Sequence, residues 1–144
     1  LFASAYDVAV IFQLLLNKGT YGGRRSFPAA PVDMFTAYHS KISHRGLAFD
    51  KPATDDDDGG PAGDRCSALA FGHQGFTGTC VWADPATGIV FVFLSNRVYP
   101  SGANHKINKL NVRTTAQDYI YEAFGIPVNH ERMTGYKAQL GIIK

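Results

Sequence analysis

The spacing of apolar residues predicts an amphipathic helix over residues 4–17. Ser4 and Asp7 have the spacing of a capping box, in which the side chains accept from free N–H groups of the first turn. Gly19 follows the last turn, where a left-handed residue commonly ends a helix. The face expected to be buried consists of Val8, Ile11, Phe12, Leu15 and Leu16.

Two more segments have helical spacing. Residues 28–37 predict a short helix that Pro31 weakens, because proline lacks the N–H of an internal helical bond. Residues 112–124 predict a longer helix that ends before a Gly-Ile-Pro sequence. The apolar stripe of this longer helix is expected to consist of Ala116, Tyr119, Ile120 and Ala123.

Between these helices the pattern changes to that of strands. Apolar or alternating runs predict strands at residues 45–50, 70–73, 79–84 and 89–95. Turn residues at 84–88 predict a hairpin between the last two strands. Every residue from Ile89 to Leu94 is apolar, so the last strand is expected to be covered on both faces. Residues 21–25 predict a tight turn, and residues 51–68, which are rich in Asp, Gly and Pro, predict a loop.

The order of these elements predicts an α+β fold. An antiparallel sheet is expected to lie between helices, as a three-layer α/β/α piece. Residues 1–128 are expected to form this unit, and residues 129–144, which lack strong periodicity, are expected to form a C-terminal tail.

Composition and charge exclude several classes of protein. With 45% hydrophobic and 18% charged residues among 144, the chain is globular rather than disordered or collagen-like. Its net charge of +2 argues against nucleic acid as a partner. The longest apolar run has six residues, far fewer than the ~20 of a transmembrane helix.

Residues 71–79, FGHQGFTGT, are the most informative segment for function. A predicted strand runs there into a bend, and glycine allows a ligand to approach the backbone closely. His73 is the titratable side chain of the segment. From these residues alone, a glycine-rich turn with an incidental histidine remains the alternative.

Two further sequences follow this segment, VWADP at 81–85 and FLSNRVYP at 93–100. Together the three resemble the C-terminal part of the serine β-lactamase and penicillin-binding-protein superfamily, most closely its class C-like branch. The resemblance covers residues 1–126 and implies a partial β-lactamase/transpeptidase-like fold. In that family the third motif is Lys-Thr-Gly or His-x-Gly, to which His73-Gln74-Gly75 corresponds.

The resemblance implies acyl transfer, in which a serine attacks an amide or ester carbonyl and the acyl-enzyme is later hydrolysed. Phe76, the residue after the third motif, would donate its backbone N–H to the oxyanion. His73 would act beside the substrate carboxylate or in proton transfer, and Gly75 would leave room for the acyl group. The candidate substrate-binding residues are Gln74, Asn108 and Arg113, although a plain surface loop is the alternative for the stretch before the last helix. No cofactor is implied.

The family's nucleophile is missing from the sequence. No serine is followed by lysine three positions later, and the second motif, Tyr-x-Asn or Ser-x-Asn, is absent as well. The nearest sequence, Tyr38-His39-Ser40, stands in the wrong part of the chain. The chain starts without methionine or a signal sequence and enters a helix at once. We therefore expect a C-terminal lobe that is catalytically incomplete as this chain.

Metal sites fit the sequence poorly. Residues 55–58 and the two glycines after them match neither register of a calcium loop, which favours a solvated acidic loop. The histidines and cysteines lack the spacing of zinc ligands. Cys66 and Cys80 are expected to be separate thiols, because Cys80 would face a residue near His73 across the predicted hairpin; a disulfide is the alternative if the protein is extracytoplasmic.

The leading hypothesis is the C-terminal lobe of a β-lactamase-related serine hydrolase whose parent acts on a small-molecule, peptide or cell-wall amide or ester. By resemblance, its location would be the periplasm or cell envelope of a bacterium. The alternatives are a non-catalytic accessory or binding module, such as one fused to a glycoside hydrolase, and a module that only binds a partner. An uncovered sheet edge and helix face would favour homo-oligomers.

Overall fold

A computed structural model describes residues 2–40, 42–53 and 60–129. The helices are α1 (Ala5–Leu16), α2 (Ala29–Thr36), α3 (Lys106–Lys109) and α4 (Val112–Ala123). The strands are β1 (Thr20–Tyr21), β2 (Arg24–Arg25), β3 (Phe71–Gln74), β4 (Cys80–Asp84) and β5 (Ile89–Phe93). The predictions for α1, α2, α4 and β3 to β5 are confirmed to within two residues at each end. The predicted acidic loop and residues 130–144 of the predicted tail lie outside the described residues.

Both predicted ends of α1 are confirmed. The Asp7 N–H donates to Ser4 Oγ at 3.2 Å, and the Ser4 N–H donates to Asp7 Oδ2 at 3.0 Å, which completes the capping box. The hydrogen bonds from Ser4 lower the pKa of the Asp7 carboxyl. At the other end Gly19 has a φ of +87° and donates its N–H to the carbonyl of Leu14. The predicted tight turn then joins β1 and β2 as a hairpin.

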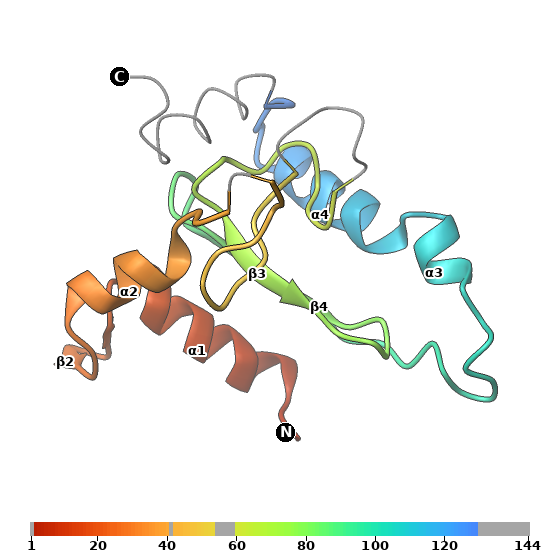
Figure 1. Cartoon of the computed structure of the whole chain (residues 1–144), viewed down its shortest axis with the longest axis horizontal. Helices are drawn as coiled ribbons and strands as arrows, with labels where there is room; N and C mark the ends of the chain where they lie inside the picture. Colours follow the sequence, from red (N-terminus) through yellow and green to blue (C-terminus); the bar gives the residue numbers. More distant parts are fainter. Residues whose placement is uncertain (1, 41, 54–59, 130–144) are drawn as a thin grey trace.

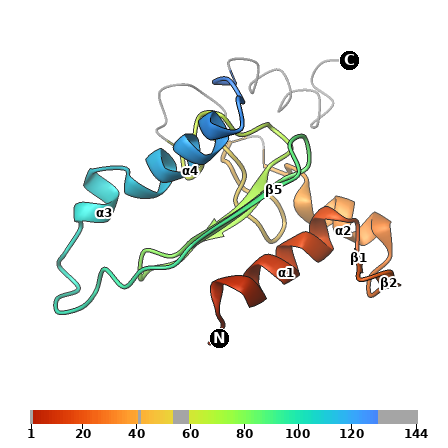
Figure 2. The same ribbon diagram turned by 180° about the vertical axis from the view of Figure 1, so that it is seen from behind.

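The main sheet has the strand order β3-β4-β5, with both pairs antiparallel. His73 pairs with Val81, Gln74 with Cys80, and Trp82 with Phe91. Helix α1 lies against one face of this sheet and α4 lies on the other face (Figures 1 and 2). The α+β fold with three layers, predicted from the order of elements, is confirmed.

Among the described residues, the core consists of two clusters, one on each face of the sheet. On the α1 side, Phe12 stacks on Phe71 with ring centres 6.0 Å apart. On the α4 side, Trp82 and Tyr121 are fully buried and pack against Phe91. Strand β5 contacts both clusters, since Val90 packs on the α1 side and Phe91 on the α4 side. The expectation that this strand is covered on both faces is confirmed, although each of its residues is only half-buried.

The predicted strand at residues 45–50 is wrong. The N–H of Gly46 donates to the carbonyl of Phe49 at 2.9 Å, and Arg45 pairs with Asp50 as an isolated bridge. The segment therefore turns back on itself within six residues and cannot extend as a strand. Its last residue, Asp50, bridges to Gly72 at the outer edge of β3.

The predicted buried faces of two helices also need correction. In α4, Tyr119 and Ile120 are exposed, and the buried residues are Gln117 and Tyr121. Polar side chains of α4 satisfy loop backbone groups: Gln117 Oε1 accepts from the Gly63 N–H at 2.8 Å. The spacing of apolar residues along a helix does not indicate that a glutamine is buried in order to accept a hydrogen bond from a loop. In α1, Ile11 is 48% exposed, although Phe12 is buried as predicted.

No described helix combines the length and the apolar character that crossing a bilayer requires.

Candidate functional site

Strand β3 brings His73 and Gln74 to the outer edge of the sheet. Gly72 donates its N–H to the Asp50 carbonyl at 3.0 Å and accepts from the Asp50 N–H at 2.8 Å. The backbone groups of Gly72 thus face away from β4, and alternation along the strand directs those of Gln74 the same way. The bridge from Asp50 therefore covers the edge of β3 at Gly72 and does not extend to His73-Gln74-Gly75.

The ring of His73 is exposed and has a defined tautomer. Its Nδ1 lies 2.8 Å from the carbonyl oxygen of Gln74. A carbonyl only accepts hydrogen bonds, so Nδ1 carries the proton and donates it. In the neutral ring, Nε2 is then left with a lone pair that can accept a proton or a hydrogen bond.

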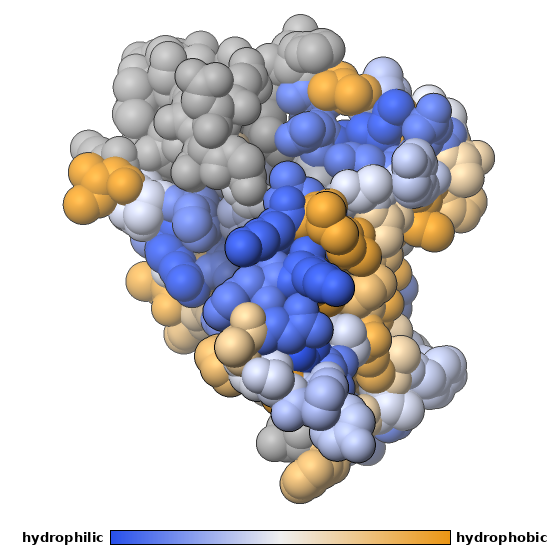
Figure 3. Space-filling model, turned by 90° about the vertical axis from the view of Figure 1, so that its right-hand side faces the viewer, coloured by the Kyte–Doolittle hydropathy of each residue, from blue (hydrophilic) through white to orange (hydrophobic). Residues whose placement is uncertain are grey.

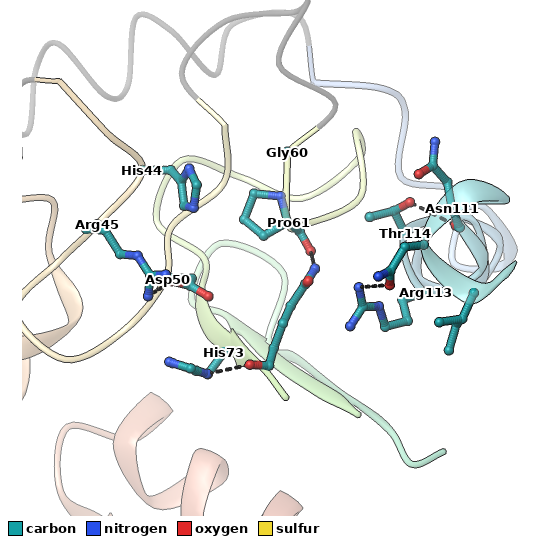
Figure 4. A pocket seen from close by; sticks show the side chains of 12 residues that line it. His44, Arg45, Asp50, Gly60, Pro61, His73, Asn111, Arg113 and Thr114 are labelled. Carbon is teal, nitrogen blue, oxygen red and sulfur yellow. Dashed lines mark hydrogen bonds and ion pairs between the residues drawn. The ribbon is translucent and has the colours of Figure 1, made fainter. Parts of the chain in front are cut away.

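A cavity of about 420 Å³ opens beside this edge (Figure 4). One wall carries His44, Arg45, Asp50 and His73, and the opposite wall carries the side chains that precede or begin α4 (Figure 4). The residues around the cavity are His44, Arg45, Asp50, Gly60, Pro61, His73, Gln74, Ile107, Asn108, Asn111, Arg113 and Thr114. Four of the predicted site residues therefore meet in one place, namely His73, Gln74, Asn108 and Arg113.

The short helix α3 and the start of α4 form the second wall. Asn111 links the two helices in the left-handed conformation, with a φ of 50°. Asn108 Oδ1 accepts a hydrogen bond from Arg113 Nη2 at 3.0 Å. This contact orients the guanidinium and leaves its other N–H groups available for a ligand, since guanidinium has five donors.

The charged and titratable cavity residues that the sequence prediction of the site does not include are His44, Arg45 and Asp50. Arg45 and Asp50 belong to the segment predicted as a strand and His44 directly precedes it; the fold of this segment into a turn brings Asp50 to Gly72 of β3. Arg45 and Asp50 form an ion pair, with the Asp50 carboxylate almost fully buried. On the other side of His73, Gln74 Nε2 donates to the carbonyl of Pro61 at 2.5 Å.

The charge of the cavity favours an anionic ligand. Among the described residues that line it, two arginines and two histidines face the cavity, against the single carboxylate of Asp50. Since Asp50 is paired with Arg45, the charge left for a ligand is that of Arg113 and of any protonated histidine. Within the described ranges, no three His, Cys, Asp or Glu side chains gather to hold a metal ion.

Gly75 and Phe76 lie just beyond the cavity, in the turn that joins β3 to β4. The Gly75 N–H donates to the Thr79 carbonyl at 2.8 Å, and the Gly78 N–H donates to the Gly75 carbonyl at 2.9 Å. Phe76 is at the tip of this turn, with its side chain 76% exposed. No described residue accepts the N–H of Phe76. The turn stands at the end of the molecule that carries α3, where hydrophilic side chains gather beside a strip of hydrophobic ones (Figure 3).

The two cysteines are buried and remain separate thiols, as predicted. Cys66 Sγ lies 3.0 Å from the carbonyl of Gly63, to which it donates. Burial raises the pKa of the Cys80 thiol to about 11, so this group stays protonated at neutral pH.

An antiparallel sheet between helices, with a His-Gln-Gly sequence on its edge strand, is the arrangement expected for a family of serine hydrolases. The chain belongs to this family: the model described as Beta-lactamase matches it over residues 1–115. Among its curated relatives are proteins named "Putative D-alanyl-D-alanine carboxypeptidase" from Salmonella enteritidis, Salmonella gallinarum and Salmonella agona, each 33% identical over 109 residues. The match covers 75% of this chain and 25% of each relative, so the chain spans about a quarter of their length.

Proposed function

We propose that this chain is the C-terminal, substrate-facing lobe of a serine hydrolase whose substrate is a peptide amide or ester ending in a carboxylate. The observation that carries the proposal is that β3 presents His73 and Gln74 to the same cavity as Asn108 and Arg113. The carboxypeptidase name of the Salmonella relatives supports a D-alanyl-D-alanine peptide of the cell wall as the substrate.

Each candidate residue has a proposed role. Arg113, oriented by Asn108, would bind the terminal carboxylate, because guanidinium matches carboxylate geometry in a bidentate pair. His73 Nε2 would face the substrate or the proton-transfer network. The N–H of Phe76 would donate to the oxyanion, and Gly75 would leave space for the acyl group. No step in this scheme uses a metal ion or a cofactor.

The proposed lobe binds substrate but does not hydrolyse it unaided. The Ser-x-x-Lys sequence that supplies the nucleophile and its base in this family is absent from the 144 residues. A fluorescent penicillin should therefore leave no covalent label on the purified chain after denaturing electrophoresis. A stoichiometric label would overturn this part of the proposal.

Binding tests the proposal directly. N-acetyl-D-alanyl-D-alanine and its C-terminal amide would be titrated into the protein while amide resonances are recorded by NMR. The free acid should bind and the amide should bind at least tenfold more weakly, since the amide lacks the charge that Arg113 recognises. Arg113→Gln should weaken binding of the acid about tenfold. The matched control, Arg24→Gln in the exposed β1–β2 hairpin, should leave it unchanged. Equal binding of acid and amide, or no binding at all, would refute the proposal.

A second candidate is a non-catalytic accessory or binding module, which the absence of Ser-x-x-Lys favours. The coding sequence around these residues distinguishes the two. An upstream Ser-x-x-Lys in the same reading frame supports the hydrolase. Its absence, or a glycoside hydrolase domain in its place, supports the accessory module.

We further propose a bacterial periplasmic or cell-envelope location, which the names of the relatives support because D-alanyl-D-alanine peptides belong to the cell wall. The lobe is also proposed to associate with itself through surfaces that the described residues leave uncovered. Strand β5 is apolar throughout and pairs only with β4 within the described part of the chain.

A further inference from the structure

Arg97 lies against the turn that contains Phe76. Its Nε donates to the Phe76 carbonyl at 2.7 Å, and its guanidinium carbon is 4.5 Å from the centre of the Phe76 ring. Its backbone N–H donates to the carbonyl of Thr77 at 2.9 Å. A single residue after β5 therefore holds both central residues of the β3–β4 turn.

The same guanidinium also reaches the loop that leads to α3. Arg97 Nη1 donates to the carbonyls of Gly102 at 3.2 Å and Asn104 at 3.0 Å. Asn104 in turn accepts from the N–H of Lys106, the first residue of α3, at 3.1 Å. Helix α3 carries Asn108, which orients Arg113. Contacts of Arg97 thus connect the turn with the wall that would bind the carboxylate.

The turn also packs closely against the segment before Arg97. A Cβ atom at Gly78 would lie 2.6 Å from Ser95 Oγ and 3.1 Å from Ile107 Cδ1. Ser95 Oγ donates to the Thr77 carbonyl at 3.3 Å. The Phe76 N–H lies in the same peptide plane as the Gly75 carbonyl, which accepts from the Gly78 N–H at 2.9 Å, so this bond and the contacts of Arg97 together restrain the direction of the Phe76 N–H.

We propose that Arg97 is a positioning residue that fixes the Phe76 N–H and sets its distance from Arg113. This inference rests on the proposed function, because only acyl transfer gives that N–H an oxyanion to bind. The role needs the planar fork of arginine, since one flat group must bond three carbonyls and lie on an aromatic ring at once. Lysine supplies the charge but not the plane.

The experiment compares wild type, Arg97→Lys and Arg97→Ala, with N-acetyl-D-alanyl-D-alanine as the probe. In the wild type, the dipeptide should move the Phe76 amide resonance as it binds. Both variants should bind about tenfold more weakly and lose this movement while keeping a single cooperative urea transition. Ethylguanidinium ions should restore both properties to Arg97→Ala, whereas sodium chloride at the same concentration should not. A variant with wild-type affinity and a wild-type Phe76 response would overturn the inference, as would a failure of ethylguanidinium to restore Arg97→Ala.

A second measurement separates this inference from the proposed function. If the wild type binds no dipeptide, the proposed function fails, and the restraint by Arg97 is then tested in the unliganded protein. Arg97→Lys should lower the NMR order parameters of the Phe76 and Asn104 amides and leave those of the β1–β2 hairpin unchanged. Unchanged order parameters at Phe76 would show that Arg97 does not hold the turn.

Discussion

The phenol oxygen of Tyr121, on α4, donates a hydrogen bond of 3.3 Å to the buried carboxylate of Asp84, at the end of β4. Asp84 also accepts from the Ser67 N–H at 2.9 Å, from the Ser67 hydroxyl at 2.5 Å and from the Ala86 N–H at 3.0 Å. One carboxylate thus joins a loop, the β4–β5 turn and a helix. Burial, and secondly the charge of Asp84, raise the pKa of Tyr121 well above its usual range.

Replacing the two partners should have unequal effects on stability. Tyr121→Phe removes one hydrogen bond and should lower the free energy of unfolding by about 1 kcal/mol. Asp84→Ala leaves several donors without an acceptor and should cost about 3 kcal/mol or more. Urea unfolding measures both. Tyr119→Phe, on the same helix but 66% exposed, is the control and should change little. Equal effects at positions 119 and 121 would contradict this account.

Lys51 should make stability depend on pH. Its side chain is fully buried, and Nζ donates to the carbonyls of Thr36 at 2.8 Å and Leu69 at 3.1 Å. Burial lowers the pKa of Lys51 from 10.5 to about 7. A neutral amine has two N–H groups, which match these two carbonyls.

Between these two pKa values the unfolded chain binds the proton that the folded chain has lost. The free energy of unfolding should therefore rise with pH across this window by about 1 kcal/mol per pH unit, and the contribution should be constant below pH 7. Urea unfolding at about pH 7.5 and about pH 9 tests this. Lys51→Met should flatten the slope, while Lys109→Met, at an exposed lysine of α3, should retain it. A slope that persists in Lys51→Met would assign the effect to another group.

Two glycines of β3 and its turn should tolerate alanine differently. A Cβ atom at Gly72 would lie 2.1 Å from the Val81 carbonyl oxygen and 2.6 Å from the Trp82 ring, neither of which can move away. At Gly75 the near contact is Thr79 Oγ1 at 2.3 Å, and a change of rotamer relieves it. Gly72→Ala should cost about 3 kcal/mol of unfolding free energy and Gly75→Ala about 1 kcal/mol or less. A larger cost for Gly75→Ala in urea unfolding would refute this order.

The proposed self-association should depend on the open edge of β5. Light scattering should detect dimers or larger assemblies of the wild type at micromolar concentration. Val92→Lys places a charge on the edge strand and should shift the population toward monomer, because edge lysines oppose strand pairing. Arg24→Lys, in the exposed β1–β2 hairpin, is a control with little change of charge. A monodisperse monomer of the wild type would count against association.

Sequence patterns predict the sheet and the long helices well because local rules determine them. The capping box at Ser4, the left-handed Gly19 and the hairpin at residues 84–88 are each specified by neighbouring residues. The buried side of α4 is not specified locally. It faces a loop whose N–H groups need acceptors, so Gln117 is buried where an apolar stripe predicts Tyr119.

The candidate site, too, can be predicted only in part from the sequence. The motif at His73 is readable from sequence because its glycines and its strand are contiguous. Arg45 and Asp50 are not readable, since their approach to β3 depends on a turn and on one bridge to Gly72. The role of Arg97 cannot be predicted from the sequence, because its hydrogen-bond partners lie in two separate loops.

The three strands of the main sheet are consecutive in the chain, from Phe71 to Phe93, and two short turns join them. Hairpins of this kind close in microseconds, and proteins dominated by local contacts fold fast. Helix α1 must instead reach the sheet across a long intervening segment. We expect the surface that α1 and α4 cover to be formed before either helix docks on it.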